Sequence, residues 1–471
     1  MGTHTVEKIG GTSMSRFGEV MKNVILGSRK GAELYNRIFV VSAYSGITNL
    51  LLENKKTGAP GVYGFISEDN PDWKPALEKV RSEMLRYNRS FENIGLNVKE
   101  ADDFINDRLD GIELCLKDVM NLRTFGHFRP EDYLPATREF LAAVGEVHSA
   151  WNSVQILKAN GVQARFVDLS GWKSTRSLTL DEAILDAFEG IDFRTELPIV
   201  TGYVKFDSGI MKRFDRGYSE ITFSKIAVLT EASEGIIHKE FHLSTGDPKL
   251  MGPDNVDVIG YTNFDIADQL SDMGMEAIHS KAAKEMEAKD IPIRVKNAFD
   301  PEHPGTLITR DYVSPNPRVE MICGRNDLIA IEMYDPEMVG ESGYDYRLTK
   351  HLADFGINYI AKTTNANTIS HFVPEKSRDL SDCIQSIREA FPSADVRSVK
   401  VGVVSVIGTN LRIPGFLSRA AQALYDADIN VLALDQTLRQ VNIQFVVDRE
   451  DFETAQKVLH HEFVEKNHED R

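Results

Sequence analysis

Apolar runs of strand length alternate with amphipathic stretches of helical length through roughly the first 300 residues of this chain. Residues 37–42, 164–168 and 197–202 are short runs rich in Val, Ile and Phe, and residues 256–259 form a shorter run of the same kind. Residues 142–159 instead carry apolar side chains three and four positions apart, the spacing of one helix face. Strands that alternate with helices predict a mainly parallel sheet covered by helices on both faces.

The stretch from about residue 60 to residue 134 differs from its surroundings. It is polar and charged, and its segments are helix-like. We interpret residues 60–134 as a helical insertion or lid region of the first domain.

A domain boundary is predicted near residues 304–317, where Pro, Gly, Ser and Asn cluster, and a repeat follows it. Gly343 and Gly415 stand 72 residues apart, and each is followed 14 residues later by an Ile-Asn pair. Each repeat has the pattern of a strand, a glycine turn, an amphipathic helix and two further strands, which predicts two small α+β units of one design. The predicted domains are therefore 1–310, 318–392 and 396–465.

The composition is typical of a folded protein and argues against nucleic-acid binding. Hydrophobic residues make up 42% of the 471 residues and charged residues 27%. The chain carries 54 Lys and Arg against 71 Asp and Glu, a formal charge of −17, so no basic stripe offsets the negative field. Basic residues near glycine-rich turns are therefore stronger candidates for contacts with an anionic ligand.

The cysteines and the apolar runs indicate a compartment. The three cysteines lie far apart without metal-binding spacing, which fits a reducing cytoplasm better than a disulfide framework. No apolar run approaches the roughly 20 residues that span a bilayer, and the first residues do not resemble a signal peptide. We therefore expect a cytoplasmic protein without a membrane segment.

The most informative motif is the hexapeptide at positions 8–13, KIGGTS. Two adjacent glycines let backbone N–H groups approach a ligand closely, and Lys8 adds a positive charge just before the turn. Thr12 and Ser13 are expected to cap the helix that follows, whose N-terminus favours an anion. The motif indicates a phosphate cradle, but an ordinary strand, turn and helix with a surface lysine would show the same residues.

Hydroxyl side chains follow the predicted strand at 37–42. Ser42, Ser45 and Thr48 stand where ligands collect in open α/β sheets, at the carboxyl end of a strand. These hydroxyls suit the oxygens of a phosphate or a carboxylate. The alternative is that they only cap the next helix.

Charged residues mark three further candidate sites. Glu146 is expected in the first turn of its helix, where a carboxylate either pairs with the helix dipole or holds a substrate ammonium. Arg216 suits bidentate recognition of a carboxylate, and Glu220 could orient a lysine or lie near a metal. Residues 244–249 combine turn residues with a terminal lysine, which suits the edge of a nucleotide site.

Common motifs for phosphoryl transfer and metal binding are absent from the sequence. No Gly-Lys dipeptide occurs, which excludes a P-loop, and no Gly-x-Gly-x-x-Gly follows a strand. His238 and His242 stand four apart on a predicted strand, where about 13 Å would separate them, too far to share a metal. A phosphotransferase with this sequence would be neither a P-loop enzyme nor a protein kinase.

Taken together, these loops resemble the aspartate kinases of the amino-acid kinase superfamily, over nearly the whole chain. Residues 8–13 are similar to the family's Lys-Phe-Gly-Gly-Thr-Ser signature. Residues 41–50 are similar to its Ser-Ala-x-x-Gly-x-Thr-Asn-Leu loop, and residues 145–146, 201–203 and 216–220 follow in the family's order. The C-terminal repeat resembles the family's paired ACT regulatory modules.

The resemblance implies an α/β fold with a three-layer αβα kinase domain and two C-terminal α+β ACT modules of βαββαβ order. It implies transfer of the ATP γ-phosphoryl group to the β-carboxylate of L-aspartate, giving 4-phospho-L-aspartate, the first step of aspartate-family amino-acid synthesis. ATP and Mg²⁺ are the implied cofactors. A homodimer through the ACT modules is the implied assembly, with a tetramer as the alternative.

The resemblance also implies roles for individual residues. The catalytic residues would be Lys8, Arg216 and Glu220. The aspartate-binding residues would be Ser42, Thr48, Glu146, Tyr203, Arg216 and Ser219. The ATP-binding residues would be Lys8, Gly10, Gly11, Ser13, Lys239, Glu240, Asp247 and Lys249. No side chain is implied as a metal ligand.

Several positions depart from the family pattern. Tyr218 and Glu220 replace a Gly and an Asp, and Glu276 stands where a lysine often contacts the nucleotide. Such variants look like the subgroup of aspartate kinases associated with ectoine synthesis. Two alternatives stay open: an amino-acid kinase for another carboxylate substrate, such as glutamate, and a non-catalytic effector sensor built on the ACT pair.

Overall fold

The computed structural model describes residues 2–214, 217–275 and 278–466. The chain folds into two compact units. The first comprises Met1–His242 and Ile278–Arg310, and the second comprises Leu243–Ala277 and Asp311–Arg471. Residues 243–277, which the sequence pattern assigned to the first domain, therefore group with the C-terminal part of the chain.

The first unit is built on a mainly parallel sheet with the strand order β3–β4–β2–β1–β5–β7–β8. All neighbouring pairs in it are parallel up to β7, and β8 pairs with β7 antiparallel. The central strands are buried along their length, as their apolar runs predict. The strands are β1 (Thr5–Ile9), β2 (Arg37–Val41), β3 (Ala164–Val167), β4 (Leu197–Thr201), β5 (Glu234–Lys239), β7 (Ile293–Asn297) and β8 (Thr306–Thr309).

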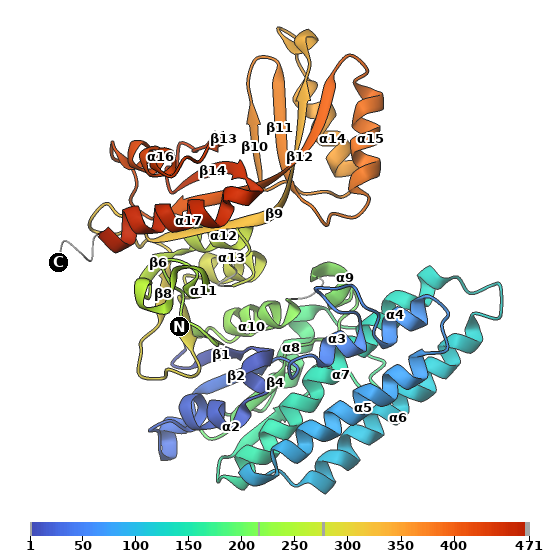
Figure 1. Ribbon diagram of the computed structural model, residues 1–471. Helices are drawn as coiled ribbons and strands as arrows, with labels where there is room; N and C mark the ends of the chain where they lie inside the picture. Colours follow the sequence, from blue (N-terminus) through green and yellow to red (C-terminus); the bar gives the residue numbers. More distant parts are fainter. Residues whose placement is uncertain (1, 215–216, 276–277, 467–471) are drawn as a thin grey trace. The chain divides into compact units, whose positions relative to one another are not determined.

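Helices cover both faces of this sheet. Figure 1 shows α10 on one face and α2 and α7 on the other, which makes the three-layer αβα arrangement that the resemblance implied. The α-helices are α1 (Gly11–Met14), α2 (Phe17–Val20), α3 (Ile47–Leu51), α4 (Val62–Ser67), α5 (Trp73–Ser90), α6 (Val98–Leu122), α7 (Pro130–Ala159), α8 (Leu180–Phe188), α9 (Ile210–Phe214), α10 (Tyr218–Leu229) and α13 (Ser280–Ala288). Shorter helical turns are η1 (Met21–Leu26), η2 (Gly31–Leu34) and η3 (Glu92–Ile94).

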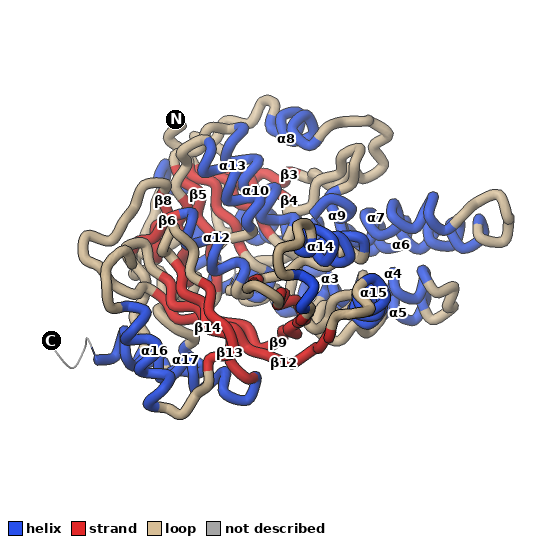
Figure 2. Tube along the Cα trace, turned by 90° about the horizontal axis from the view of Figure 1, so that it is seen from above, coloured by secondary structure: helices blue, strands red, loops and turns tan. Residues whose placement is uncertain are grey.

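The segment at 60–134 is helical and contains α4, α5, α6 and the start of α7. Figures 1 and 2 show α6 and α7 side by side as a long hairpin. Ile105, Leu109, Ile112 and Leu116 form the buried stripe of α6, at the spacing of one helix face.

Two of the predicted elements differ from the structure, one in its start and one in being absent as a strand. The helix predicted at 142–159 begins at Pro130, a proline at the first helical position, and Asp132 accepts a hydrogen bond from the Arg129 amide at 3.2 Å. Residues 256–259 form no strand, because only a single bridge joins Val258 to Ser244 there.

The second unit contains a six-stranded antiparallel sheet with the order β10–β11–β9–β12–β14–β13. Its strands are β9 (Met321–Tyr334), β10 (Ala361–Thr364), β11 (Thr368–Pro374), β12 (Asp395–Ile407), β13 (Val431–Asp435) and β14 (Asn442–Asp448). Its helices are α14 (Tyr344–Asp354), α15 (Leu380–Ala390), α16 (Phe416–Asp426) and α17 (Phe452–His460), with η5 (Pro336–Met338), η6 (Arg449–Asp451) and η7 (His461–Glu465). The segment before them supplies α11 (Pro248–Met251), η4 (Pro253–Asn255), β6 (Tyr261–Asn263) and α12 (Phe264–Asp272).

The two long strands β9 and β12 each serve both modules of this unit. Residues 328–334 of β9 pair with β11 and with 395–401 of β12, whereas 321–325 pair with 403–407, across a register shift between Val401 and Val403. The first module is thus βαββαβ, from the second half of β9 to the first half of β12. The fold class inferred from the family resemblance is confirmed.

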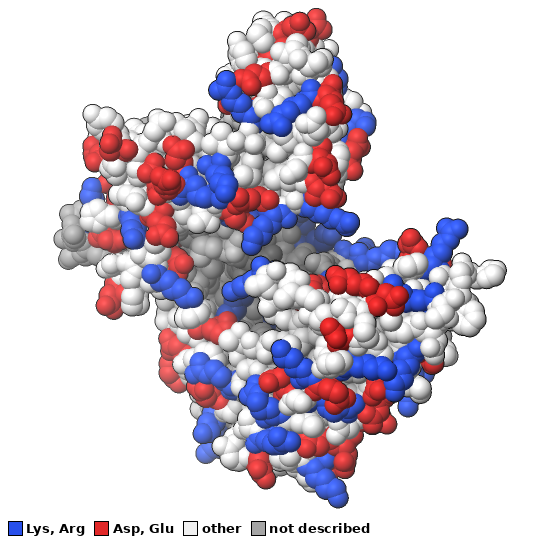
Figure 3. Space-filling model, turned by 45° about the vertical axis from the view of Figure 1, so that its right-hand side comes forward, with Lys and Arg blue, Asp and Glu red and all other residues white. Residues whose placement is uncertain are grey.

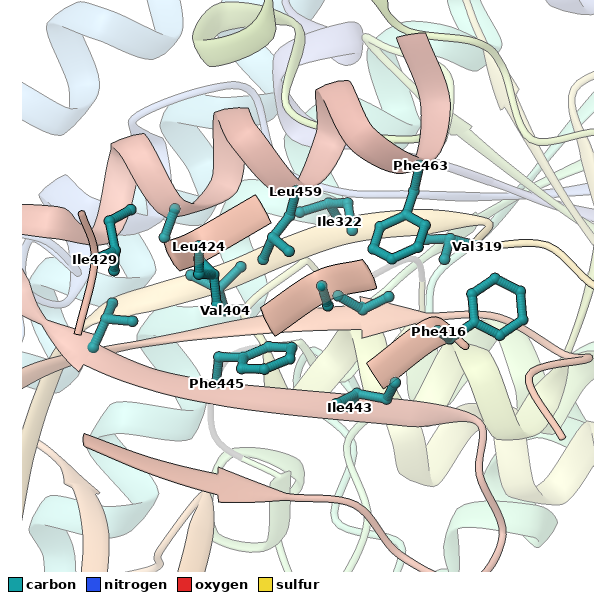
Figure 4. Packing of buried hydrophobic residues seen from close by; sticks show 14 of the residues in the cluster. Val319, Ile322, Val404, Phe416, Leu424, Ile429, Ile443, Phe445, Leu459 and Phe463 are labelled. Atoms are coloured by element: carbon teal, nitrogen blue, oxygen red, sulfur yellow. The ribbon is translucent and has the colours of Figure 1, made fainter. Parts of the chain in front are cut away.

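Each module has its own apolar core. In the second module, Leu424 of α16 and Leu459 of α17 pack with Val404 of β12 and Phe445 of β14 (Figure 4). In the first, side chains of α14 and α15 pack on β9 and β11 in the same way. The glycine-and-helix repeat seen in the sequence therefore corresponds to two separately packed helix-on-sheet layers.

Acidic and basic side chains are interspersed over the face drawn in Figure 3. Among the described residues, none of the helices has the length and apolar character needed to cross a bilayer.

Candidate active site

Four strands of the first unit lead into predicted site residues at one edge of the sheet. Strand β1 carries Lys8 and runs into residues 10–13, and β2 runs into Ser42. Strand β4 is followed by residues 202–203, and β5 ends at Lys239. Because these strands are parallel neighbours, their carboxyl ends lie at the same edge, where ligands bind in open α/β sheets.

Lys8 and Glu220 form an ion pair at this edge. The Lys8 Nζ lies 3.2 Å from Glu220 Oε1, and the two side chains are only 12% and 11% exposed. Glu220 Oε2 accepts a hydrogen bond of 2.5 Å from the His279 amide. Burial alone would raise the pKa of Glu220, but Lys8, Lys239 and the His279 amide outweigh it and lower that pKa. Of the two roles considered for Glu220, orientation of a lysine is the one that the geometry supports.

Glu146 lies in the middle of α7, and its carboxylate is buried. Its Oε1 accepts a hydrogen bond of 2.7 Å from Ser219 Oγ, which in turn lies 3.3 Å from the Ser42 Oγ. Its Oε2 is buried and has no partner among the described residues. Burial raises the pKa of Glu146 to about 8, although Ser219, Lys8 and the Tyr203 backbone act in the opposite direction. The prediction that Glu146 lies in a first turn is wrong, because the helix begins four turns earlier, so a dipole role is excluded.

The backbone around Glu146 leaves no spare room. A Cβ on Gly202 would lie 2.7 Å from Ser219 Cβ and 3.0 Å from Glu146 Oε1. A Cβ on Gly145 would lie 2.8 Å from that of Ala43. Glycine is therefore required where β4, α7 and α10 meet, because the carboxylate and the hydroxyl occupy the space of a side chain.

Tyr203 is held by a residue that the sequence analysis missed. Its hydroxyl donates to Glu139 Oε2 at 2.9 Å, and Glu139 Oε1 accepts from the Lys212 amide at 3.0 Å. Burial and the Glu139 carboxylate raise the pKa of Tyr203. A signal was available, because Glu139 precedes Glu146 by seven positions, two turns along one helix face.

The glycine loop after β1 packs tightly on the loop after β2. A Cβ on Gly11 would lie 2.6 Å from the Ala43 carbonyl oxygen, and the Gly10 amide donates to the His238 carbonyl at 3.4 Å. The expected capping by Thr12 and Ser13 is wrong, because both residues lie inside α1, whose N-cap is Gly10. Ser13 Oγ instead donates to Glu240 Oε1 at 3.3 Å.

For the remaining predicted site residues, no side-chain contact with Lys8, Glu146 or Glu220 is described. Thr48 lies in α3 and is half-buried. Asp247 and Lys249 belong to the second unit, where Asp247 caps α11 by accepting from the Lys249 amide at 2.9 Å. Arg216, and Glu276 among the departures from the family pattern, lie outside the described residues.

A buried charge network lies next to Lys8 along β1. Arg37 donates to both oxygens of Glu7 at 2.6 and 3.1 Å and also to the carbonyls of Val24 and Ile25. His238 Nε2 lies 2.7 Å from Glu7 Oε2. Burial alone would raise the pKa of Glu7, but Arg37 and His238 together hold it well below its usual range. The network fixes β1 between β2 and β5, and with it the position of Lys8.

Among the described residues, no group of three or more His, Cys, Asp or Glu side chains has metal-binding geometry. Two carboxylates contact the residues of β1 and the glycine loop: Glu220 accepts from Lys8 and Glu240 accepts from Ser13. Such a donor set fits a Mg²⁺ ion that keeps most of its contacts with phosphate oxygens and water.

A cavity of about 960 Å³ lies beside α7 and shares Glu139 and Tyr203 with the candidate site. Its lining includes Tyr203, Glu139, Phe140 and Trp172. Lys8, Glu146, Ser219 and Glu220, which we call the charged cluster, are not among the described residues that line it. Charged side chains held in a largely buried site, as in the charged cluster, can stabilise charge that develops in a transition state.

Comparison with known proteins identifies relatives of the whole chain. Residues 4–297 match the model of the amino acid kinase family, and residues 404–463 match an ACT domain model. The protein named Aspartate kinase Ask_Ect, from Stutzerimonas stutzeri (strain A1501), is 47% identical over 99% of both chains. Aspartokinase 1, chloroplastic, from Arabidopsis thaliana is 26% identical and covers 98% of this chain and 81% of its own.

Solved structures show the same fold. The structure of E. coli aspartokinase III in complex with lysine and aspartate superposes with a TM-score of 0.72 at 20% identity, covering 98% of this chain and 99% of that one. The structure of Clostridium acetobutylicum aspartate kinase superposes with a TM-score of 0.72 at 21% identity, covering 98% of this chain and 100% of that one.

Proposed function

Because this chain belongs to the amino acid kinase family and is an aspartate kinase, we propose that its charged cluster transfers the γ-phosphoryl group of ATP to the β-carboxylate of L-aspartate. The observation that supports this assignment most strongly is that Lys8, 12% exposed, acts electrostatically on the buried Glu146 carboxylate, one oxygen of which has no partner among the described residues. The lysine suits a phosphate, and the carboxylate suits an ammonium.

Glu146 would bind the ammonium group of aspartate. A buried carboxylate whose Oε2 has no partner among the described residues is costly to ionise unless a cation pairs with it. The substrate ammonium supplies that cation, and Ser219 keeps the carboxylate oriented through its bond to Oε1. Arg216, with its planar guanidinium, would bind a carboxylate of the substrate through two hydrogen bonds. Ser42, Thr48 and Tyr203 would line the rest of the aspartate pocket.

Lys8 would stabilise the charge that builds up on the transferring phosphoryl group. The attacking β-carboxylate is already ionised at neutral pH, so no general base is needed. A carboxylate oxygen forms a bond to the γ-phosphorus, the bond from that phosphorus to the β,γ-bridging oxygen breaks, and ADP leaves with the electron pair. Glu220 would hold Lys8 in place, and positioning and charge stabilisation would provide the catalysis.

The nucleotide would lie over the glycine loop. Gly10, Gly11 and Ser13 would approach its phosphates, and Lys239 and Glu240 would border it. Asp247 and Lys249 stay ATP-binding candidates on the sequence resemblance alone. When bound, Mg²⁺ would neutralise phosphate charge, and Glu240, which accepts a hydrogen bond from Ser13 of the glycine loop, would contact its water shell.

We also propose a homodimer formed through the ACT modules, with a tetramer as the alternative. The edge strand β13 exposes Leu432 and Leu434, which are 44% and 40% exposed. An exposed sheet edge with apolar side chains is a surface that a second copy would cover. Sedimentation at equilibrium would distinguish a dimer from a tetramer.

The departures from the family pattern at Tyr218, Glu220 and Glu276 and the relative named Aspartate kinase Ask_Ect support placing this chain in the subgroup associated with ectoine synthesis. The product 4-phospho-L-aspartate would then feed that synthesis as well as the aspartate-derived amino acids.

The experiment that tests the assignment is ADP release with ATP and aspartate, with ATP and glutamate, and with ATP alone. We expect release to depend on aspartate. Equal release with glutamate would indicate another amino-acid kinase, and no release above the ATP-only rate would indicate an effector sensor.

A further inference from the structure

Two hydroxyl groups join the glycine loop after β1 to the hydroxyl-rich loop after β2. Ser15 Oγ accepts a hydrogen bond from the Ser45 amide at 2.8 Å and lies 3.2 Å from the Gly11 carbonyl oxygen. Tyr87 OH donates to the Ser45 carbonyl at 3.1 Å and lies 3.0 Å from Ser15 Oγ. The pair therefore contacts the backbone of both loops at once, whereas Tyr87 itself comes from α5 of the helical insertion.

The Tyr87 ring is held as firmly as its hydroxyl. It is 7% exposed and stacks on Tyr44, with the ring centroids 4.5 Å apart and the planes 18° apart. Tyr44 belongs to the loop after β2 and is itself buried. A stacked and buried aromatic ring has few alternative rotamers, so the hydroxyl stays at the junction of the loops.

The neighbouring residue fixes the rotation of α5. Asn88 is fully buried, and its Oδ1 meets His148 Nε2 at 2.7 Å and Asn152 Nδ2 at 2.8 Å, both from α7. Its Nδ2 donates to Asp102 of α6 at 2.7 Å. Burial lowers the pKa of His148 to about 3, so this histidine is neutral near pH 7 and serves as an ordinary hydrogen-bonding group. The helix that carries Glu146 is thereby tied to the helix that carries Tyr87.

We propose that Tyr87 and Ser15 are positioning residues for phosphoryl transfer, which hold the glycine loop beside Lys8 at a fixed distance from the acceptor loop at 42–48. In this arrangement the helical insertion is a support for both substrate loops. The inference rests on the proposed placement of ATP and aspartate at these loops.

The geometry explains why a hydroxyl is needed at position 87. The loops after β1 and β2 are in close contact at Gly11, where a Cβ would lie 2.6 Å from the Ala43 carbonyl oxygen. A shift of either loop therefore changes the distance between the phosphoryl donor, ATP, and the acceptor, aspartate. The position of reacting groups affects the rate strongly, with about 1 Å of misplacement costing on the order of 100-fold. Without the Tyr87 hydroxyl, the Ser45 carbonyl loses its donor, and the bond from the Ser45 amide to Ser15 Oγ is left to hold the loop.

The test compares Tyr87→Phe, Ser15→Ala and the double variant in steady-state kinetics with aspartate and ATP. Tyr87→Phe keeps the stacked ring and removes only the oxygen. We expect kcat to fall about 2- to 13-fold, the effect of losing one hydrogen bond, with a smaller change in either KM. We expect the double variant to be no slower than the slower single variant, because the two hydroxyls act as one unit.

Tyr35→Phe is the matched control. The Tyr35 hydroxyl also receives a hydrogen bond, from the Gln163 amide at 3.2 Å, but it lies just before β2, at the end of that strand away from Ser42. We expect Tyr35→Phe to have the kcat of the unaltered enzyme, and thermal melting to show Tyr87→Phe folded at the assay temperature.

Two results would overturn the proposal. One is a kcat for Tyr87→Phe equal to that of Tyr35→Phe, and the other is fully multiplicative effects of Tyr87→Phe and Ser15→Ala. Either result leaves the proposed function intact as long as Lys8→Ala is inactive, whereas an active Lys8→Ala variant would remove the site itself.

Discussion

Aspartate binding should release a proton, because Glu146 must ionise to meet the substrate ammonium. With its pKa raised to about 8, the carboxyl is roughly one-tenth ionised at pH 7 and roughly three-quarters ionised at pH 8.5. Affinity scales with the ionised fraction, so the Kd for aspartate should be about eightfold higher at pH 7 than at pH 8.5, a difference of about 1.2 kcal/mol.

Calorimetric titration with aspartate at pH 7, in two buffers of different ionisation enthalpy, measures the proton directly. We expect about 0.9 proton released per site. Glu146→Gln is the control, because it keeps the shape and the bond to Ser219 but cannot ionise, so its binding should be weaker and should release no proton. A Kd that does not change between pH 7 and pH 8.5, with no proton release, would refute the pairing of Glu146 with the ammonium.

The same carboxyl has a consequence for stability in the absence of substrate. Its folded-state pKa is raised above the ordinary value of 4.5, so the folded protein holds a proton that the unfolded chain releases. Its contribution to stability is therefore full below about pH 4.5 and declines as the pH rises toward 8. Glu146→Gln should remove that decline, which thermal melting across this range would detect.

Three further outcomes are expected. Arg216→Ala should raise the KM for aspartate at least tenfold and leave that for ATP nearly unchanged, and a change confined to ATP would contradict the acceptor role. Gly202→Ala should also raise the KM for aspartate, because the new Cβ would lie 2.7 Å from Ser219 Cβ. Gly126→Ala is the control: a Cβ at this position has open space around it, so the KM for aspartate should not change. Glu7→Gln should lower the free energy of unfolding at pH 7 by about 3–5 kcal/mol in chemical denaturation, because the buried Arg37 guanidinium would lose its charged partner. Because the pKa of Glu7 is depressed, its contribution is present above about pH 4.5 and is lost in acid, so the variant should lose less stability than the parent below that pH.

Local patterns in the sequence predicted the order of the elements and the loops of the candidate site. Alternating apolar runs predicted the parallel sheet, and the spacing of Gly343 and Gly415 predicted the two modules. The start of α7 was missed because the apolar spacing is clear only from residue 142 onward, although Pro130 and Asp132 mark a helix start. The position of Glu146 in its helix was wrong for the same reason.

Contacts between distant segments could not be predicted from local patterns. The pairing of Lys8 with Glu220 spans 212 positions, and the bond from Tyr87 to Ser45 joins an insertion to a loop 42 positions before it. The sharing of β9 and β12 by both modules depends on a register shift between Val401 and Val403 that carries no sequence signal we recognise. Such contacts follow from the folded sheet, and only coordinates reveal them.

The central claim is that Lys8 stabilises the charge on the phosphoryl group in the transition state of its transfer. The kcat of Lys8→Ala tests this claim most directly. The variant is assayed for ADP release at saturating ATP and aspartate, after circular dichroism has shown that it is folded. We predict a kcat lower by about 100-fold or more, with a modest change in the KM for aspartate. A folded Lys8→Ala enzyme that turns over at close to the original rate would contradict the account.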